Sequence, residues 1–194
     1  MHMHGLTKSV AAVAACGALA AGGACRSSSA GAGNTGGTVM GNYMPTSATD
    51  ANILALLHES NLGEIQAANV AKERAKNEEV RSFAQRMIDE HSTLDQQGSA
   101  LAQQLGVTPE LPNKALQETQ SLEMQTIGPM SGGIFDRTYM RQQVNAHERT
   151  LNIVDASIEK TQNADLRSAL QTQVRPRVAD HLRMAQELRD RVRE

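Results

Sequence analysis

The sequence predicts an all-α protein whose main body is a four-helix bundle. After residue 49 the chain is dominated by Glu, Gln, Ala, Leu, Arg and Met, which are strong helix formers, and runs of β-branched residues are absent. Apolar residues recur at helical spacing through four long stretches. The one substantial interruption is a segment punctuated by glycine and proline, residues 106–133. These three observations favour helices throughout and no sheet.

The first 25 residues are typical of a secretory signal. Lys8 precedes an Ala- and Val-rich run, residues 10–24, which is too short and has side chains too small for a convincing membrane span. The two cysteines, Cys16 and Cys25, both lie within or at the end of this region, so a disulfide framework is excluded from the folded domain. We therefore expect an exported, periplasmic protein.

The leader is similar to bacterial lipoprotein signals, and this resemblance implies a lipidated cysteine. Cys25 is preferred because a more adequate apolar run precedes it, although Gly22 stands where such signals prefer leucine. The residues that end at Cys16 fit the lipidation motif better, and simple cleavage after a small residue such as Ala20 is a third possibility. A lipid on Cys25 would make a membrane the partner of the mature N-terminus.

A tether is predicted to follow the leader. Residues 26–48 are rich in Ser, Gly, Ala and Thr and show no apolar periodicity, so they have nothing to bury. A flexible chain of this length has an r.m.s. reach on the order of 25 Å. The remaining residues, 49–194, are enough for one domain with its own core.

Four long helices are expected within this domain, at residues 50–76, 78–105, 134–161 and 165–191. Asn77 is expected to cap the second, with Glu78 and Glu79 placed favourably in its first turn. Pro112 can begin a short additional helix that ends before Gly128. Proline within the fourth helix, at residue 176, is expected to kink it.

The length of the segment 106–133 favours a particular connectivity. A direct antiparallel connection between helices takes only a few residues, whereas a crossover along a bundle roughly 40 Å long takes about this many. We therefore predict two helical hairpins joined by a long crossover, with the second and third long helices parallel. This is the arrangement of ferritin-like bundles.

Each long helix carries one polar residue within its apolar stripe: Glu64, His91, His147 and His181. At 1.5 Å per residue, Glu64 and His91 lie about 18 Å and 21 Å from the turn between the first two helices. His147 and His181 also fall near mid-helix, some 15 and 17 residues from the second turn. All four side chains can therefore share one layer of the core.

Three imidazoles and one carboxylate in a layer predict a single transition metal ion. Such a set suits tetrahedral zinc or mononuclear iron, manganese or copper, and imidazole alone does not select among them. A two-iron site is disfavoured because Ile88 and Val178 stand three residues before His91 and His181, where di-iron bundles carry glutamate.

Other interpretations of the same residues stay open. In a metal-free envelope protein, structural or interacting with partners, Glu64 would pair with a protonated histidine or with Arg177 in a buried hydrogen-bond network. Met87 and Met184, one turn from His91 and His181, are typical core residues, with Cu(I) ligation as the alternative.

Several functions are poorly supported by the sequence. There is no phosphate-binding glycine loop, metalloprotease motif or nucleophile elbow, so no catalytic residue is assigned and enzymatic activity stays open. With two Phe, two Tyr, no Trp and a net charge of -2, nucleic acid is not expected as a partner. Arginines in the last helix alternate with acidic residues, which indicates a solvated face. No protein partner is identified.

A succession of motifs resembles the family called domain of unknown function 4142. It consists of Gly63-Glu64, the run at 83–88 leading to Glu90-His91-Ser92, the run at 135–139, His147, and Pro176 followed by His181-Leu182. The resemblance covers nearly all of the chain after the tether. It implies an exported bacterial protein with a ferritin-like helical fold, of a kind often described as a membrane or outer-membrane protein, and implies no activity. One departure is Glu90, where the motif usually has Asp.

Overall fold

The computed structural model describes residues 43–193, and this part of the chain is all-α, without a strand, which confirms the predicted class. The predicted signal, Cys16, Cys25 and residues 26–42 of the predicted tether lie outside the described residues. None of the described helices combines the length and apolar character needed to cross a membrane. The helices are α2 (Asp50–Arg74), α3 (Glu78–Leu105), α4 (Ala115–Ile127), α5 (Gly132–Lys160), α6 (Ala164–Ala169), the π-helix η1 (Leu170–Val174) and α7 (Arg175–Arg191).

The turn between α2 and α3 is held by two side chains. Asn77 caps α3 as predicted, because its side-chain oxygen accepts from the backbone N–H groups of Glu79 and Val80 at 2.8 and 3.3 Å. The carboxylate of Asp136, near the start of α5, accepts from the backbone N–H groups of Lys76 and Asn77 at 3.0 and 2.9 Å. Helix α2 therefore ends at Arg74, two residues before the predicted end, while α3 has its predicted bounds.

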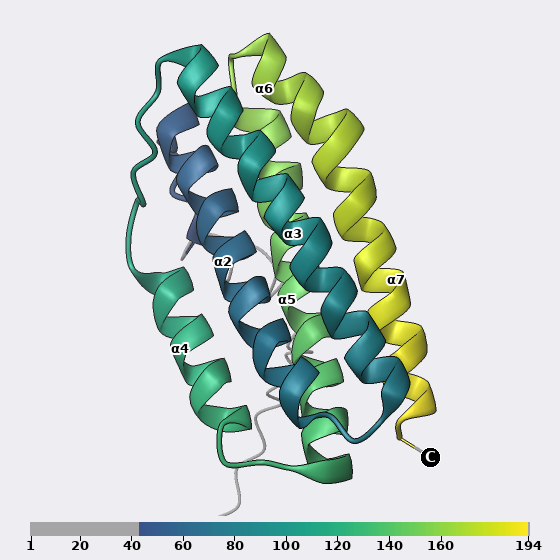
Figure 1. Cartoon of the computed structure of the whole chain (residues 1–194). Coiled ribbons are helices and arrows are strands. Elements are labelled where there is room, and N and C mark those ends of the chain that lie inside the picture. Colours follow the sequence, from purple (N-terminus) through teal and green to yellow (C-terminus); the bar gives the residue numbers. More distant parts are fainter. Residues whose placement is uncertain (1–42, 194) are drawn as a thin grey trace, which may run out of the picture. The chain divides into compact units, whose positions relative to one another are not determined.

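Contacts at the helix ends define the directions of the long helices (Figure 1). The Asp136 contact places the start of α5 beside the start of α3. At the other end, the Thr161 hydroxyl that follows α5 donates to Asp50 in the first turn of α2 at 2.6 Å. Thus α5 is antiparallel to α2 and runs in the same direction as α3, as the length of the connecting segment predicts.

The connection between α3 and α5 carries the predicted short helix, α4, which begins at Ala115 rather than Pro112. It packs along α2 and α5: the Gln120 side chain donates to the backbone oxygen of Glu59 at 3.0 Å, and Arg149 pairs with Glu123 at 3.0 Å. Gly63 leaves room for the Gln120 side chain, because a Cβ there would lie 2.1 Å from the side-chain nitrogen of Gln120.

The fourth long helix is interrupted where Pro176 predicts a kink. The interruption is the π-helix η1, which ends with the Arg175 N–H donating to the carbonyl oxygen of Leu170, five residues earlier. Proline has no N–H, and its ring clashes with the carbonyl four residues before it, here that of Thr172. Widening the preceding turn to a π-helix accommodates the ring, so the helix continues as α7 with Pro176 in its first turn.

The packed part of the chain begins before Thr49, which corrects the predicted extent of the tether. Tyr43 and Met44 are buried in the core. The hydroxyl of Thr119 donates to a backbone oxygen of α4, so Tyr43 donates its own hydroxyl to Thr119 Oγ1, at 3.1 Å. Two isolated apolar residues produce no periodicity, and only their packing against α4 and α5 reveals their role.

The apolar core consists of two clusters with a polar layer between them. One contains Phe83, Phe135 and Tyr139 from the first turns of α3 and α5, and the other contains residues from the opposite ends of the helices, such as Leu56 and Ile153. In each long helix the polar residue predicted for the layer lies between its contributions to the two clusters.

Candidate metal centre

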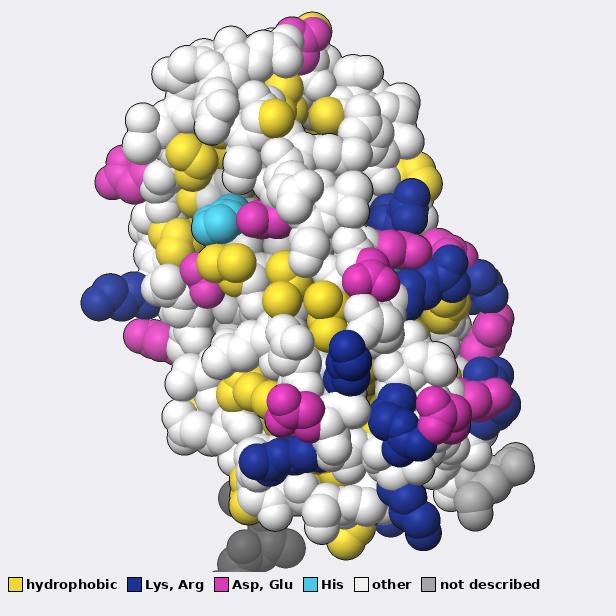
Figure 2. All heavy atoms as spheres, in the orientation of Figure 1, with side chains coloured by type: hydrophobic (Ala, Val, Ile, Leu, Met, Phe, Trp, Pro, Cys, Tyr) yellow, Lys and Arg dark blue, Asp and Glu magenta, His cyan; other side chains and the backbone are white. Residues whose placement is uncertain are grey.

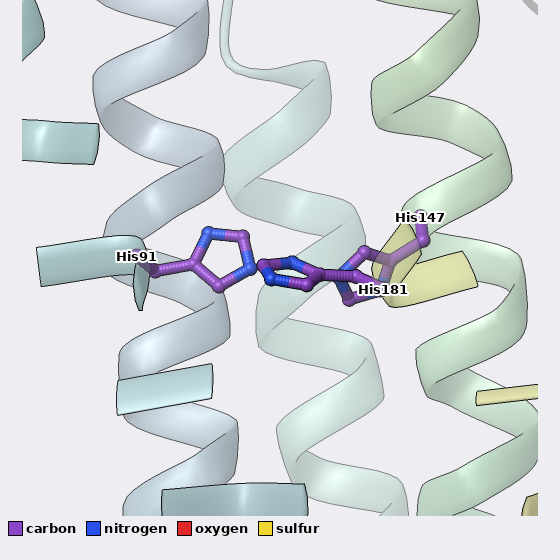
Figure 3. A group of neighbouring side chains, drawn as sticks. All are labelled: His91, His147 and His181. Carbon is purple, nitrogen blue, oxygen red and sulfur yellow. The ribbon is translucent and has the colours of Figure 1, made fainter. Parts of the chain in front are cut away.

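Three histidines meet in the centre of the core, each from a different helix: His91 from α3, His147 from α5 and His181 from α7. Their exposed fractions are 1%, 1% and 0%. Figure 3 shows the three rings pointing toward one another, and the ring centroids form a nearly equilateral triangle with sides of 5.0, 5.3 and 5.6 Å. The structure thus brings together the three histidines predicted from the sequence.

Each imidazole uses one ring nitrogen as a hydrogen-bond donor. His91 Nδ1 donates to the side-chain oxygen of Asn61 at 2.9 Å, and His147 Nδ1 donates to the backbone oxygen of Gln143 at 2.8 Å. His181 uses its other nitrogen, Nε2, which donates to the carboxylate of Glu90 at 2.7 Å. All three partners are oxygen acceptors, so these contacts determine which nitrogen of each ring carries the proton.

The other nitrogen of each ring faces the cluster without a hydrogen-bond partner. These atoms are His91 Nε2, His147 Nε2 and His181 Nδ1, and all three are buried. One potential ligand nitrogen from each ring lies within 4.8 Å of those from the other two. The layer therefore contains three buried acceptor nitrogens that no described donor satisfies, in a core where buried polar atoms are normally paired.

The surroundings of His91 and His181 favour the neutral form of both rings. Burial, followed by the proximity of His147, lowers the pKa of His181 from 6.5 to about 4. Burial and the two neighbouring histidines lower the pKa of His91 well below its ordinary value. A neutral imidazole that donates from one nitrogen has a free lone pair on the other, which is the form that binds metal ions.

Glu90 is hydrogen-bonded to the cluster at His181. It also accepts from Arg86 and Arg177, both at 2.8 Å. Burial alone would raise the pKa of Glu90, but the hydrogen bonds from Arg177, Arg86 and His181 outweigh it and lower the pKa from 4.5 to about 2. The ionised Glu90 therefore fixes the orientation of His181 from behind the ring.

Glu64 lies beside the cluster and outside the group of converging nitrogens. It is 6% exposed, and its Oε1 is 3.8 Å from His147 Nδ1, the nitrogen turned away from the group. Its other oxygen accepts from the Gln143 side chain at 2.8 Å. Arg177, which the metal-free interpretation pairs with Glu64, pairs with Glu90 instead. Glu64 was predicted as a metal ligand. In the structure it contacts the outer side of His147 instead.

The geometry of the three nitrogens fits a metal ion. Three points that lie within 4.8 Å of one another share a centre no more than about 2.8 Å from each, while a zinc–imidazole bond is about 2.1 Å long. Each ring therefore has to move inward by about 0.7 Å at most. Met184 is directed elsewhere, because its sulfur accepts from Arg86 at 3.0 Å. The buried histidine triad could hold a metal ion.

Asn61, Gln143 and Glu90 are parts of this site that sequence reasoning missed. Asn61 lies one turn before Glu64, and Gln143 lies one turn before His147. Amide side chains at such positions are ordinarily taken for surface residues. Glu90 stands out in the sequence as the departure from the expected Asp, immediately before His91. Its contact with α7 depends on how the helices pack, because the 100° rotation per residue places residue 90 beside the apolar stripe without showing which helix it meets.

Comparison with known proteins identifies the family of the chain. A family model described as a domain of unknown function (DUF4142) matches residues 38–188, which include the whole polar layer. No curated protein and no solved structure matches the chain. Because the family model matches well over half of the sequence, this protein belongs to the DUF4142 family.

Proposed function

We propose that this protein binds one transition metal ion in its core through His91 Nε2, His147 Nε2 and His181 Nδ1. The observation that carries this proposal is the convergence of three buried acceptor nitrogens with no donor among the described residues. In metal sites, ligating histidines donate their other ring N–H to a carboxylate, a backbone carbonyl or another oxygen. All three histidines have such a partner.

A metal-free network explains this arrangement less well. Each buried acceptor left unsatisfied costs about 1–3 kcal/mol, and a single water molecule has only two O–H groups for three acceptors. Protonating His91 or His181 would supply a donor, but burial and the adjacent rings oppose the charge on either of them. A metal ion satisfies all three lone pairs at once.

The donor set favours zinc among the ions considered. Three imidazole ligands suit zinc, copper and iron, whereas manganese prefers oxygen ligands. Zinc accepts three protein ligands and one further ligand in a tetrahedral arrangement. The three nitrogens are buried, so the site suits a tightly held ion better than rapid exchange or turnover of a substrate.

Glu64 has a place in this proposal as the counterion. Its carboxylate is buried, it accepts from the neutral amide of Gln143 among the described residues, and it lies 3.8 Å from His147. A buried carboxylate is stable only when paired. A divalent ion bound to His147 would supply the compensating positive charge, while Glu90 is already compensated by two arginines.

We further propose a ferritin-like four-helix bundle in an exported lipoprotein. The parallel α3 and α5, joined by the segment that carries α4, support the ferritin-like connectivity. The apolar leader and the absence of cysteine after residue 25 support export, with Cys25 as the lipidated residue. The proposed role is metal binding in the bacterial envelope.

The test is the metal content of the protein. Purified without chelator, it is expected to contain about one equivalent of metal, and after chelation it is expected to take up one equivalent of Zn²⁺. Iron(II), manganese(II) and copper(I) are tested in parallel. His147→Ala should abolish uptake, whereas the matched control His58→Ala removes an exposed histidine and should not. Failure of all four metals to bind would leave the metal-free envelope protein as the function.

Export and lipidation have a separate test, mass spectrometry of the mature N-terminus. The expected result is a chain that begins with an acylated Cys25. An acylated Cys16 would correct only the choice of cysteine, and an unacylated N-terminus near Ala20 would indicate a soluble exported protein. An intact leader on protein from the cytoplasm would contradict export.

A further inference from the structure

A cavity of about 580 Å³ lies in the half of the described domain that contains the start of α2 and the end of α3. Its walls also include residues of α5, α6, η1 and α7. The volume falls within the range of small-molecule sites, roughly 300–1,000 Å³. None of the three histidines lines this cavity, so it is separate from the proposed metal site.

Two features keep the cavity open. Gly98 lies on the core face of α3 between Leu94 and Leu101, yet a Cβ at Gly98 would have no heavy atom within 4 Å. The π-helix η1 supplies part of the opposite wall, including Leu170 and Val174. π-helical turns occur frequently at functional sites. A packed core normally fills such space, so the absence of a side chain at Gly98 indicates a cavity that the helices maintain.

The charges on the walls define the kind of molecule that fits. Among the described residues no lysine or arginine lines the cavity, and the one carboxylate that does, Asp95, is hydrogen-bonded to His58 Nδ1 at 2.6 Å. Figure 2 shows a histidine against an acidic side chain on this face, with hydrophobic side chains nearby. The other polar groups are hydroxyls and amides, such as Gln97 and Gln173. An anionic ligand would find no partner for its charge.

We propose that this cavity binds a neutral, largely apolar small molecule that carries a hydrogen-bonding group. The leucine and valine side chains bury its apolar part, and the amides and His58 at the wall hydrogen-bond its polar group. Asn61 lies in the cavity wall and also accepts from His91, so the ligand would sit next to the metal layer without contacting the metal. The proposal does not depend on the presence of an ion.

The experiment uses two fluorescent probes with closely related ring systems and different charge. N-phenyl-1-naphthylamine is neutral, and 8-anilinonaphthalene-1-sulfonate adds a negative charge. The neutral probe is expected to bind the purified protein with at least tenfold higher affinity, with about one site per chain. Equal or tighter binding of the sulfonate would overturn the assignment of a neutral ligand.

Gly98→Leu tests whether the neutral probe binds in this cavity. The leucine side chain extends into the open space and should reduce the affinity for the neutral probe at least tenfold, without loss of helix content. Gln103→Leu adds the same side chain at an exposed position of the same helix and should leave the affinity unchanged. Undiminished binding to a folded Gly98→Leu protein would place the probe elsewhere and overturn the proposal.

A second measurement on the unmodified protein keeps the test decisive if Gly98→Leu does not fold. Linear alcohols of increasing length should displace the neutral probe, with affinity that rises about fourfold per added CH₂ and stops rising once the cavity is full. Affinity that rises without a limit would indicate binding to an open surface and contradict the proposal. His147→Ala, which removes the proposed metal, should retain probe binding, so the two proposals fail independently.

Discussion

At the scale of single residues, the tautomers of the three histidines decide what the cluster can bind. Two present Nε2 to the centre and one presents Nδ1, and the difference follows from the partner behind each ring. Because Glu90 holds the proton on His181 Nε2, the lone pair lies on Nδ1. The residues behind the histidines should therefore tune metal affinity without touching the ion.

Glu90→Gln tests this at His181. The glutamine amide can donate to Nε2, which would move the ring proton to Nδ1 and direct it at the ion, so zinc affinity is expected to fall by about 10–100-fold. Competition titration with a zinc chelator measures the change. Glu90→Asp, the residue usual in the family motif, retains a carboxylate and should recover most of the affinity. Unchanged affinity in Glu90→Gln would show that Glu90 does not position His181.

Glu64→Gln tests whether Glu64 is a counterion of the metal or one of its ligands. Without metal, the change removes a buried carboxylate that no described lysine or arginine pairs with, so the free energy of unfolding should stay the same or increase. With metal, loss of the counterion beside His147 should lower zinc affinity by about tenfold. Urea unfolding measures the change in the free energy of unfolding, and zinc titration measures the change in zinc affinity. A complete loss of binding, equal to that of His147→Ala, would instead identify Glu64 as a ligand.

At the scale of the helices, the carboxylate of Asp136 ties two hairpins together. It is buried and accepts two backbone N–H groups from the turn between α2 and α3, which no helix hydrogen bond satisfies. This contact joins the ends at which α3 and α5 both begin. The turn between the first two helices therefore depends on a residue almost 60 positions further along the chain.

Asp136→Ala is expected to lower the free energy of unfolding by about 2–3 kcal/mol, because hydrogen bonds to a charged group are strong and both N–H groups would lose their acceptor. Asn77→Ala removes only the local cap of α3 and should cost about 1 kcal/mol. Urea denaturation of the two variants provides the comparison. Equal losses would show that the long-range contact adds nothing beyond an ordinary cap.

At the scale of the whole described domain, metal binding should stabilise the fold, since the three ligands come from three different helices. An ion that binds only the folded state adds about 4 kcal/mol when the free ion is at 1,000 times its Kd. Thermal or urea unfolding with and without Zn²⁺ measures this difference. It should vanish in His147→Ala and persist in His58→Ala, and a stability indifferent to zinc in the unmodified protein would contradict the proposed site.

The charged surface along α7 is a solvated face with charges of both signs. Arginine and acidic side chains alternate along the α7 side of the face in Figure 2, and Arg183 pairs with both Asp180 and Glu187. Isolated surface pairs of this kind contribute little to stability. The mixed face agrees with the sequence-based expectation of a solvated helix.

Local pattern was sufficient to predict most of the helices and the three histidines of the cluster. Helical periodicity depends on neighbours three and four residues apart, so α3 and its Asn77 cap could be predicted closely. A constant rise per residue likewise placed His91, His147 and His181 at one height. The length of the segment 106–133 predicted that α5 runs parallel to α3.

Tertiary structure decided which groups meet within that layer. The height of a residue along its helix does not determine which side chains of neighbouring helices it contacts. Glu64 therefore lies at the predicted height but away from the converging nitrogens, whereas Glu90 contacts His181. The same limitation applies to Asn61, and to Tyr43 and Met44, whose burial depends on helices far along the chain. The sequence alone determined the elements and the shared layer, because both follow from short-range geometry, and packing between helices decided the partners.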